Sequence, residues 1–190
     1  MCVPEQRRLA GSGQRGFTLV ELMVTVAVLA IIMALAFPSF TMLIRSNRLT
    51  STANELVAAL QVSRSDAVRL NGGVSLCRSD DGSTCASGGD WTHVLTVTRD
   101  GTVLRTTTLR TGLTVSSSAL DALGDKVTFN ADGIARDSNG MPLNSDAVLV
   151  VCMPVTSPSD NVRSVSMSGG SRISIARSSN GGQCPGQTAP

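Results

Sequence analysis

The feature that most constrains this chain is an uncharged apolar segment near its amino terminus. Leu22 to Ile44 are 23 consecutive residues without a charged side chain. As a helix this segment would be about 35 Å long, enough to cross a bilayer core of roughly 30 Å. One carboxylate, Glu21, stands directly before it. Because an ionised side chain in hydrocarbon costs at least ~2.5 kcal/mol, Glu21 needs either the membrane interface or a cationic partner.

Basic residues are concentrated before this segment. The chain contains 16 Lys and Arg against 14 Asp and Glu, and its first 16 residues hold three arginines and one acid. The remainder is balanced, with 13 basic and 13 acidic residues. The excess charge therefore favours a positive-inside membrane orientation over a nucleic-acid surface. We expect residues 17–44 to span a membrane and residues 45–190 to form one exported globular domain.

A conventional secretory signal also has a basic start and an apolar core, and "ALAF" at residues 34–37 resembles its cleavage site. Two features argue against that interpretation. The apolar run continues past Ala36 to Ile44, and Glu21 stands at its start. The polar leader also ends abruptly at Gly16, which favours a different kind of processing site.

The junction GFTLVELMVTVAVLAIIMALAFPSF, residues 16–40, resembles the class III leader junction of type IV prepilins and type II secretion pseudopilins. The resemblance implies that residues 1–16 are a leader peptide. It implies that a prepilin peptidase cleaves after Gly16 and methylates the new amino terminus, Phe17. It also implies that Glu21 pairs with the Phe17 amine of a neighbouring subunit. A pairing within one helix, four residues apart, is the alternative.

Beyond the apolar segment, the sequence predicts that one amphipathic helix continues over residues 45–70. Its apolar positions recur at steps of three, four or seven residues: Leu49, Ala53, Leu56, Leu60 and Ala67. Asn71-Gly72-Gly73 follows, and we expect glycine to end the helix there.

Residues 74–178 change character and predict β-structure. The short β-branched runs, separated by turn signals, are VSLC, HVLTVT, TVLRTTTLR, LTVS, KVTF, AVLVVCM, RSVSMS and SRISIA. Asp100-Gly101 and Gly169-Gly170 are expected hairpin turns, because positive φ costs little at glycine. We expect an α+β fold in which the long N-terminal helix, transmembrane and then amphipathic, packs on an antiparallel β-sheet domain. Residues 179–190 are rich in Gly and Ser and are expected to form a flexible tail.

The cysteine count indicates an oxidising compartment. Cys2 lies in the leader, which leaves Cys77, Cys85, Cys152 and Cys184 in the exported part. An even set predicts two disulfides, for which three connectivities are possible. The chain contains one histidine and no usual zinc-binding spacing, so we expect no metal site and no cofactor.

Two further stretches resemble the GspH/FimT family of minor pilins: VSLCRSDDGSTCASGGDW at residues 74–91 and VTFNADG at residues 127–133. The family resemblance implies a pilin-like fold, a cysteine loop closed by Cys77 and Cys85, and a tether between Cys152 and Cys184. It also implies a minor subunit held in the bacterial inner membrane with a periplasmic domain. Other pilins would then be its partners in a type IV pilus or type II secretion pseudopilus, near the tip and in assembly priming.

Candidate catalytic groups are few, so we expect no enzyme activity. His93 follows Trp91 closely, which favours packing at a strand edge. Asp80 and Asp81 lie in the predicted cysteine loop, where a solvated turn is the main interpretation and calcium binding the alternative.

Weak DNA binding is the alternative function. Residues 161–190 contain three arginines, Arg163, Arg172 and Arg177, and no acid. DNA-uptake minor pilins of the same family carry a Gly-Arg-x-Arg motif, and the matching positions here are residues 169–172. Only the last arginine, Arg172, is retained, because Gly170 replaces the first. The three arginines are otherwise interpreted as protection of a sheet edge against aggregation.

Overall fold

The computed structural model describes residues 16–185, without the side chains of Pro38 and Ala147. The predicted leader, residues 1–16, therefore lies almost entirely outside the described residues. The chain divides into two compact units, residues 1–40 and 41–190. Helix α1, Leu19–Arg69, runs through both. The sequence predicted this helix over residues 17–70, so its ends differ by one or two residues.

Asn71 ends helix α1, not the glycines that follow it. Its backbone adopts φ 49°, while its N–H donates to Val68 O and the Gly72 N–H donates to Ala67 O. These two bonds satisfy carbonyls of the last helical turn around one left-handed residue. The helix therefore ends where Asn71-Gly72-Gly73 was expected to stop it, and asparagine, which tolerates the left-handed conformation better than most residues, takes that position instead of glycine.

The C-terminal part of α1 buries the predicted apolar stripe. All five residues are almost completely inaccessible: Leu49, Ala53, Leu56, Leu60 and Ala67. Ser63 lies on the same side and its hydroxyl is 3.2 Å from the Thr96 hydroxyl. The three- and four-residue spacing thus places one side of the helix against the domain, as predicted.

Eight strands and one short 3-10 helix follow α1 within the described residues. The strands are β1 Val74–Ser79, β2 His93–Thr98, β3 Val103–Thr108, β4 Thr114–Ser116, β5 Lys126–Phe129, β6 Ser145–Cys152, β7 Val162–Ser168 and β8 Arg172–Ser178. The 3-10 helix is Asp121–Leu123. Every run that the sequence singled out as a strand is one.

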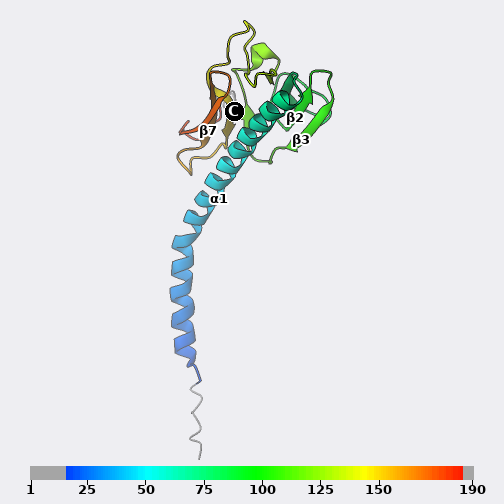
Figure 1. Ribbon diagram of the computed structural model, residues 1–190. Helices are drawn as coiled ribbons and strands as arrows, with labels where there is room; N and C mark the ends of the chain where they lie inside the picture. Colours follow the sequence, from blue (N-terminus) through cyan, green and yellow to red (C-terminus); the bar gives the residue numbers. More distant parts are fainter. Residues whose placement is uncertain (1–15, 186–190) are drawn as a thin grey trace, which may run out of the picture. The chain divides into compact units, whose positions relative to one another are not determined.

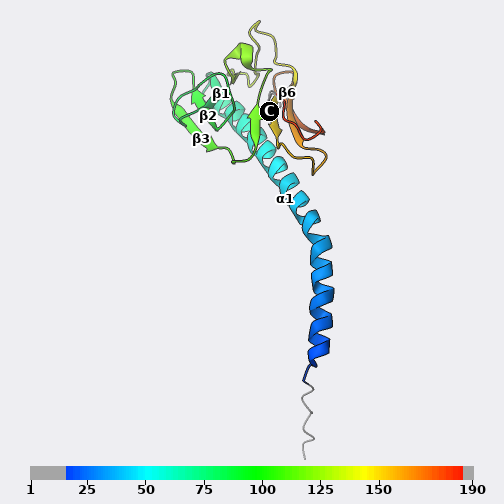
Figure 2. The ribbon, with the colours of Figure 1, turned by 180° about the vertical axis from the view of Figure 1, so that it is seen from behind.

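The strands form two antiparallel sheets. The first has the order β3-β2-β1-β5 and the second the order β4-β6-β7-β8. Figures 1 and 2 show strands of the first sheet on one side of the C-terminal part of α1 and strands of the second on the other. One apolar core joins the helix stripe to both sheets, with Phe129 and Leu149 among its fully buried members. The predicted α+β architecture is confirmed.

The Gly169-Gly170 hairpin between β7 and β8 is packed against the chain and not free in solvent. Both glycines have positive φ, 59° and 67°. The Gly170 N–H donates to Leu143 O at 2.9 Å, and the Ala135 N–H donates to Gly170 O at 2.7 Å. A Cβ on Gly170 would overlap the Ala135 carbonyl oxygen and lie 2.7 Å from Ile134 Cγ2. Glycine is therefore required here for space as well as for conformation.

The cysteines pair as the family resemblance implied, Cys77 with Cys85 and Cys152 with Cys184. The second disulfide changes the interpretation of the C-terminal segment. Cys184 is buried, and Asn161 Nδ2 donates to Gln183 O at 3.0 Å. Residues 179–185 are thus held in place, although few of them are apolar. These contacts tie the segment to the domain, the flexibility expected for residues 179–190 stays a prediction, and residues 186–190 lie outside the described part.

Arg163 of β7 has the largest of the fully buried side chains. Its guanidinium donates to the backbone carbonyls of Asp160 at 2.7 Å and Val162 at 2.9 Å. It also donates to two α1 hydroxyls, Ser46 at 3.2 Å and Thr50 at 3.4 Å. The Asp160 carboxylate is 3.4 Å away. Arg163 therefore joins the helix to the second sheet through charge-assisted hydrogen bonds.

We predict that Arg163→Ala lowers the free energy of unfolding by at least ~2 kcal/mol, because the buried carbonyls and helix hydroxyls lose their donor. Urea denaturation of a fragment spanning residues 41–190 measures this. Arg177→Ala is the matched control, since Arg177 is the cross-strand partner of Arg163 and is exposed. Equal losses for both variants would contradict the role given to Arg163.

We predict that Gly170→Ala destabilises the domain by ~2 kcal/mol more than Gly169→Ala. Both replacements place alanine at positive φ, but only the Cβ at position 170 meets neighbouring atoms. The same denaturation experiment compares them. Similar stabilities of the two variants would show that the turn does not pack on the Ala135 segment.

Candidate functional site

The junction of the leader and the helix is accessible at its described residues. Gly16 has open space around it, and the Phe17 side chain is 84% exposed. Regular helix begins only at Leu19. The bond between Gly16 and Phe17 therefore lies in non-helical backbone, the form in which a peptidase can bind it.

Thr18 caps the first turn of α1, a role that was not predicted from the sequence. The Glu21 backbone N–H donates to Thr18 Oγ1 at 3.2 Å. Thr18-Leu19-Val20-Glu21 is thus a T-x-x-E capping sequence, which is recognisable without a structure. Glu21 is exposed in this first turn. A carboxylate at that position is favoured by the partial positive charge of the helix amino terminus.

The first unit exposes apolar side chains around its whole circumference. Large exposed side chains between residues 17 and 44 include Leu22, Met23, Ile31, Leu35 and Phe40. The Thr25 hydroxyl donates to Leu22 O at 2.9 Å, so this polar group is satisfied within the helix. By length and composition this helix can cross a membrane. Such a surface requires lipid or other apolar helices around it.

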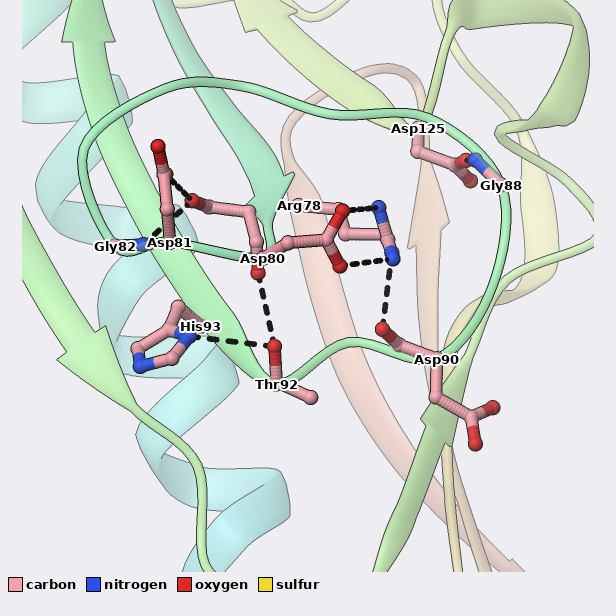
Figure 3. Close-up of polar contacts among 10 residues, drawn as sticks. Arg78, Asp80, Asp81, Gly82, Gly88, Asp90, Thr92, His93 and Asp125 are labelled. Carbon is pink, nitrogen blue, oxygen red and sulfur yellow. Dashed lines mark hydrogen bonds and ion pairs between the residues drawn. The ribbon is translucent and has the colours of Figure 1, made fainter.

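Arg78 organises the loop that the Cys77–Cys85 disulfide closes. Its side chain is 6% exposed and donates to both carboxylate oxygens of Asp80. Its Nε donates to Asp90 O at 2.9 Å, so one guanidinium joins the disulfide-closed loop to the segment that leads into β2 (Figure 3). This polar centre substitutes for the apolar core that so small a loop lacks.

Asp81 stabilises the turn within the same loop. Its carboxylate accepts hydrogen bonds from the backbone N–H groups of Ser83 and Thr84, both at 2.9 Å, and from the Ser79 hydroxyl at 3.0 Å. The bonds from the Ser83 and Thr84 backbone hold the pKa of Asp81 well below its usual range. Asp80 and Asp81 thus serve different partners inside the loop, which supports the turn interpretation over calcium binding.

Trp91 and His93 lie in the structured part of the domain and not in an open catalytic cleft. Trp91 is 3% exposed and belongs to the main core. His93 is half-buried at the start of β2, and its Nδ1 lies 3.2 Å from the Thr92 hydroxyl, as Figure 3 shows. His93 thus begins an inner strand of the first sheet, where it pairs with Ser79 and Thr108.

The structure does not bring the three candidate DNA-binding arginines together. Arg163 is fully buried, so it cannot contact a phosphate in the folded domain, and this part of the prediction was wrong. The sequence contains the pattern that accompanies this burial. Arg163, Val165 and Met167 are two residues apart in β7, so the Arg163 side chain lies on the same face of the strand as two apolar residues. Arg177 pairs with Arg163 and shares that face. Arg172 lies five residues earlier and therefore projects from the opposite face.

Position 170, where the motif would place its first arginine, has no room for a side chain. Gly170 stands at the position that the resemblance assigned to the first arginine of the motif, and its backbone packs directly on Ala135. No side chain fits at this position without moving that segment. The Gly-Arg-x-Arg arrangement is therefore incompatible with this turn.

Comparison with known proteins agrees with these features. The family model for type II transport protein GspH matches residues 52–181. The model for the prokaryotic N-terminal methylation motif matches residues 11–37. No curated protein sequence matches the chain.

Two crystal structures of the type IV minor pilin FimU from Pseudomonas aeruginosa PAO1 are similar to the chain. The structure in space group P21 is 25% identical, with a TM-score of 0.49, and the match covers 69% of this chain and 90% of FimU. The structure in space group P65 is 26% identical, with a TM-score of 0.48, and the match covers 67% and 92%.

The GspH match spans well over half of the chain and covers both sheets as well as the helix end that packs on them. The methylation motif contains Gly16, Phe17 and Glu21. The chain therefore belongs to the GspH family of minor pilins and pseudopilins.

Proposed function

We propose that this protein is a minor pilin or pseudopilin that waits in the bacterial inner membrane and then enters a filament. Residues 17–44 are its membrane anchor, and residues 45–190 are its periplasmic domain. The observation that carries the proposal is the apolar helix surface, which is exposed all round and begins at the single carboxylate of Glu21. Packing against other pilin helices would replace lipid around this surface without exposing it to water.

Processing by a prepilin peptidase and methyltransferase precedes assembly in this proposal. Cleavage after Gly16 creates an amino group on Phe17, which the same enzyme methylates. This group is cationic at neutral pH, since a free amino terminus has a pKa of about 7.7 to 8.0 in model peptides. It would stand at the end of an apolar helix and requires a counter-charge there.

Glu21 supplies that counter-charge to a neighbouring subunit. Within its own chain its backbone N–H already serves the Thr18 cap, and its carboxylate lies in the exposed first turn. An ion pair between subunits would neutralise both groups when the helices leave the lipid. The pairing with Phe17 of the same helix remains the competing arrangement.

We propose a position for the subunit at or near the tip, where it primes assembly of a type IV pilus or a type II secretion pseudopilus. Its role is mechanical, without catalysis: an anchor, a packing surface and a rigid periplasmic domain. DNA binding is not favoured, because Arg163 is buried and Arg172 and Arg177 project from opposite faces of β8.

We predict that the mature protein begins at Phe17 and carries one added methyl group on its amino terminus. Intact-mass spectrometry of the protein purified from membranes measures this directly. Cells without the prepilin peptidase should contain only the uncleaved precursor, in which Gly16 is still joined to Phe17. A mature chain that begins at Phe37 would show that the ALAF sequence was cleaved as a conventional signal and would exclude the filament proposal.

We predict that Glu21→Gln reduces the amount of the protein in sheared filaments at least tenfold but leaves its membrane content unchanged. Glutamine keeps a capping-box side chain at this position and removes only the charge. Immunoblots of membrane and filament fractions measure both amounts. Glu55→Gln is the control, since it makes the same change on the same helix beyond the membrane segment. Normal incorporation of Glu21→Gln would refute the charge pairing.

A further inference from the structure

A polar groove crosses the face of the first sheet that is turned away from the main core. It encloses about 420 Å³ and is lined by β1, β2 and β5, by the hairpin that follows β2, and by Cys85 of the cysteine loop. Ser75 pairs with Val97 on one side and with Thr128 on the other. These three residues form one row across the sheet, and the neighbours Val74 and Leu76 point into the core instead.

Two cations line this groove, Arg99 from the hairpin and Lys126 from β5. Both are exposed. Among the residues that the structure describes, neither forms an ion pair, and no carboxylate lines the groove. Asp100 stands next to Arg99 but does not line the groove, and its carboxylate accepts hydrogen bonds from the hydroxyls of Thr98 and Thr102. The residues that line the groove therefore carry two positive charges and no negative charge.

Neutral hydrogen-bonding groups surround the two cations. The Ser75 and Thr128 hydroxyls lie 2.7 Å apart, and each keeps further capacity to donate or accept. The Asn130 side chain also lines the groove. A ligand that carries both negative charge and several hydroxyl groups would match this set, whereas an apolar peptide would not.

A disulfide and strand pairing fix the backbone around the groove. The Cys77–Cys85 disulfide fixes the loop wall, and the antiparallel pairing of β1 with β2 and β5 fixes the floor. Gly73 leaves space at one end, where a Cβ would lie 3.8 Å from Arg99 Cβ and 3.9 Å from Thr128 Cγ2. A larger side chain at position 73 would extend into the groove without a clash at its first atom.

We propose that this groove binds an acidic saccharide, with Arg99 and Lys126 holding its carboxylate or phosphate group and Ser75, Thr128 and Asn130 contacting its hydroxyl groups. Rigid walls limit the entropy lost on binding, and two charge-assisted contacts give selectivity for an anionic sugar over a neutral one. The site is separate from the helix surface used in assembly, so it does not depend on the proposed function.

The test is an NMR titration of the full-length protein in uncharged detergent micelles at low ionic strength. The probes are digalacturonate, which carries carboxylates, glucose 1-phosphate, which carries a phosphate, neutral glucose and inorganic phosphate. We expect at least one acidic sugar to bind at least tenfold more tightly than glucose and than inorganic phosphate. The tighter of the two acidic sugars identifies the charged group.

Three variants locate the site. Arg99→Gln with Lys126→Gln should weaken binding of the acidic sugar at least tenfold. Gly73→Leu keeps both charges and should weaken it comparably by filling the groove. Arg172→Gln with Arg177→Gln removes the same charge from the second sheet and should change the affinity less than twofold.

Four results would overturn the proposal. The first is that neither acidic sugar binds the wild-type protein, and the second is that the Arg99 and Lys126 double variant binds the acidic sugar as tightly as the wild type does. The third is that the Arg172 and Arg177 control variant loses as much affinity as the Arg99 and Lys126 variant. The fourth is that inorganic phosphate binds the wild type as tightly as the acidic sugar does. The last result would indicate an adventitious ion only. The charge variant lies on the surface, so the test remains decisive even where Gly73→Leu disturbs folding.

Discussion

Burial of one side of the C-terminal part of α1 is the interaction on which the globular domain depends. Leu49, Leu56 and Leu60 are almost fully buried, and the core that contains them includes residues of both sheets. Burying a leucine contributes roughly 1.5 to 3 kcal/mol relative to exposure. The sheets are hydrogen-bonded within themselves but not joined into one, so the helix stripe is what the two four-stranded sheets have in common.

Two buried arginines hold the parts of the domain that lack apolar residues. Arg78 joins Asp80 of the cysteine loop to the Asp90 carbonyl in the segment before β2, and Arg163 joins the loop before β7 to the helix. A guanidinium has five N–H donors in a fixed plane, so one side chain can satisfy several carbonyls that a loop leaves unpaired. Each arginine thus fixes a loop that apolar packing could not hold, and neither remains available to bind a ligand.

The apolar side chains of the two parts of α1 have different surroundings. Residues 19–44 of α1 expose apolar side chains throughout and contain no charge after Glu21, whereas the stripe from Leu49 onward faces a protein core. An α-helix suits both surroundings, because it makes its backbone hydrogen bonds within itself. It can therefore keep the same backbone structure in lipid, in a filament and against the domain. The proposed exchange of lipid for neighbouring helices therefore requires no refolding of this segment.

The sequence alone determined the features that depend on neighbouring positions in the chain. The apolar run, the three- and four-residue stripe, the alternating strands and the glycine hairpins are local periodicities, and all of them are present in the structure. Tertiary structure decided the features that depend on what packs from elsewhere. Arg163 is buried because hydroxyls of α1 reach its guanidinium, Gly170 is required because the Ala135 segment passes beside it, and residues 179–185 are held by Asn161 and a disulfide. Each of these depends on a contact between distant segments, which no local pattern contains.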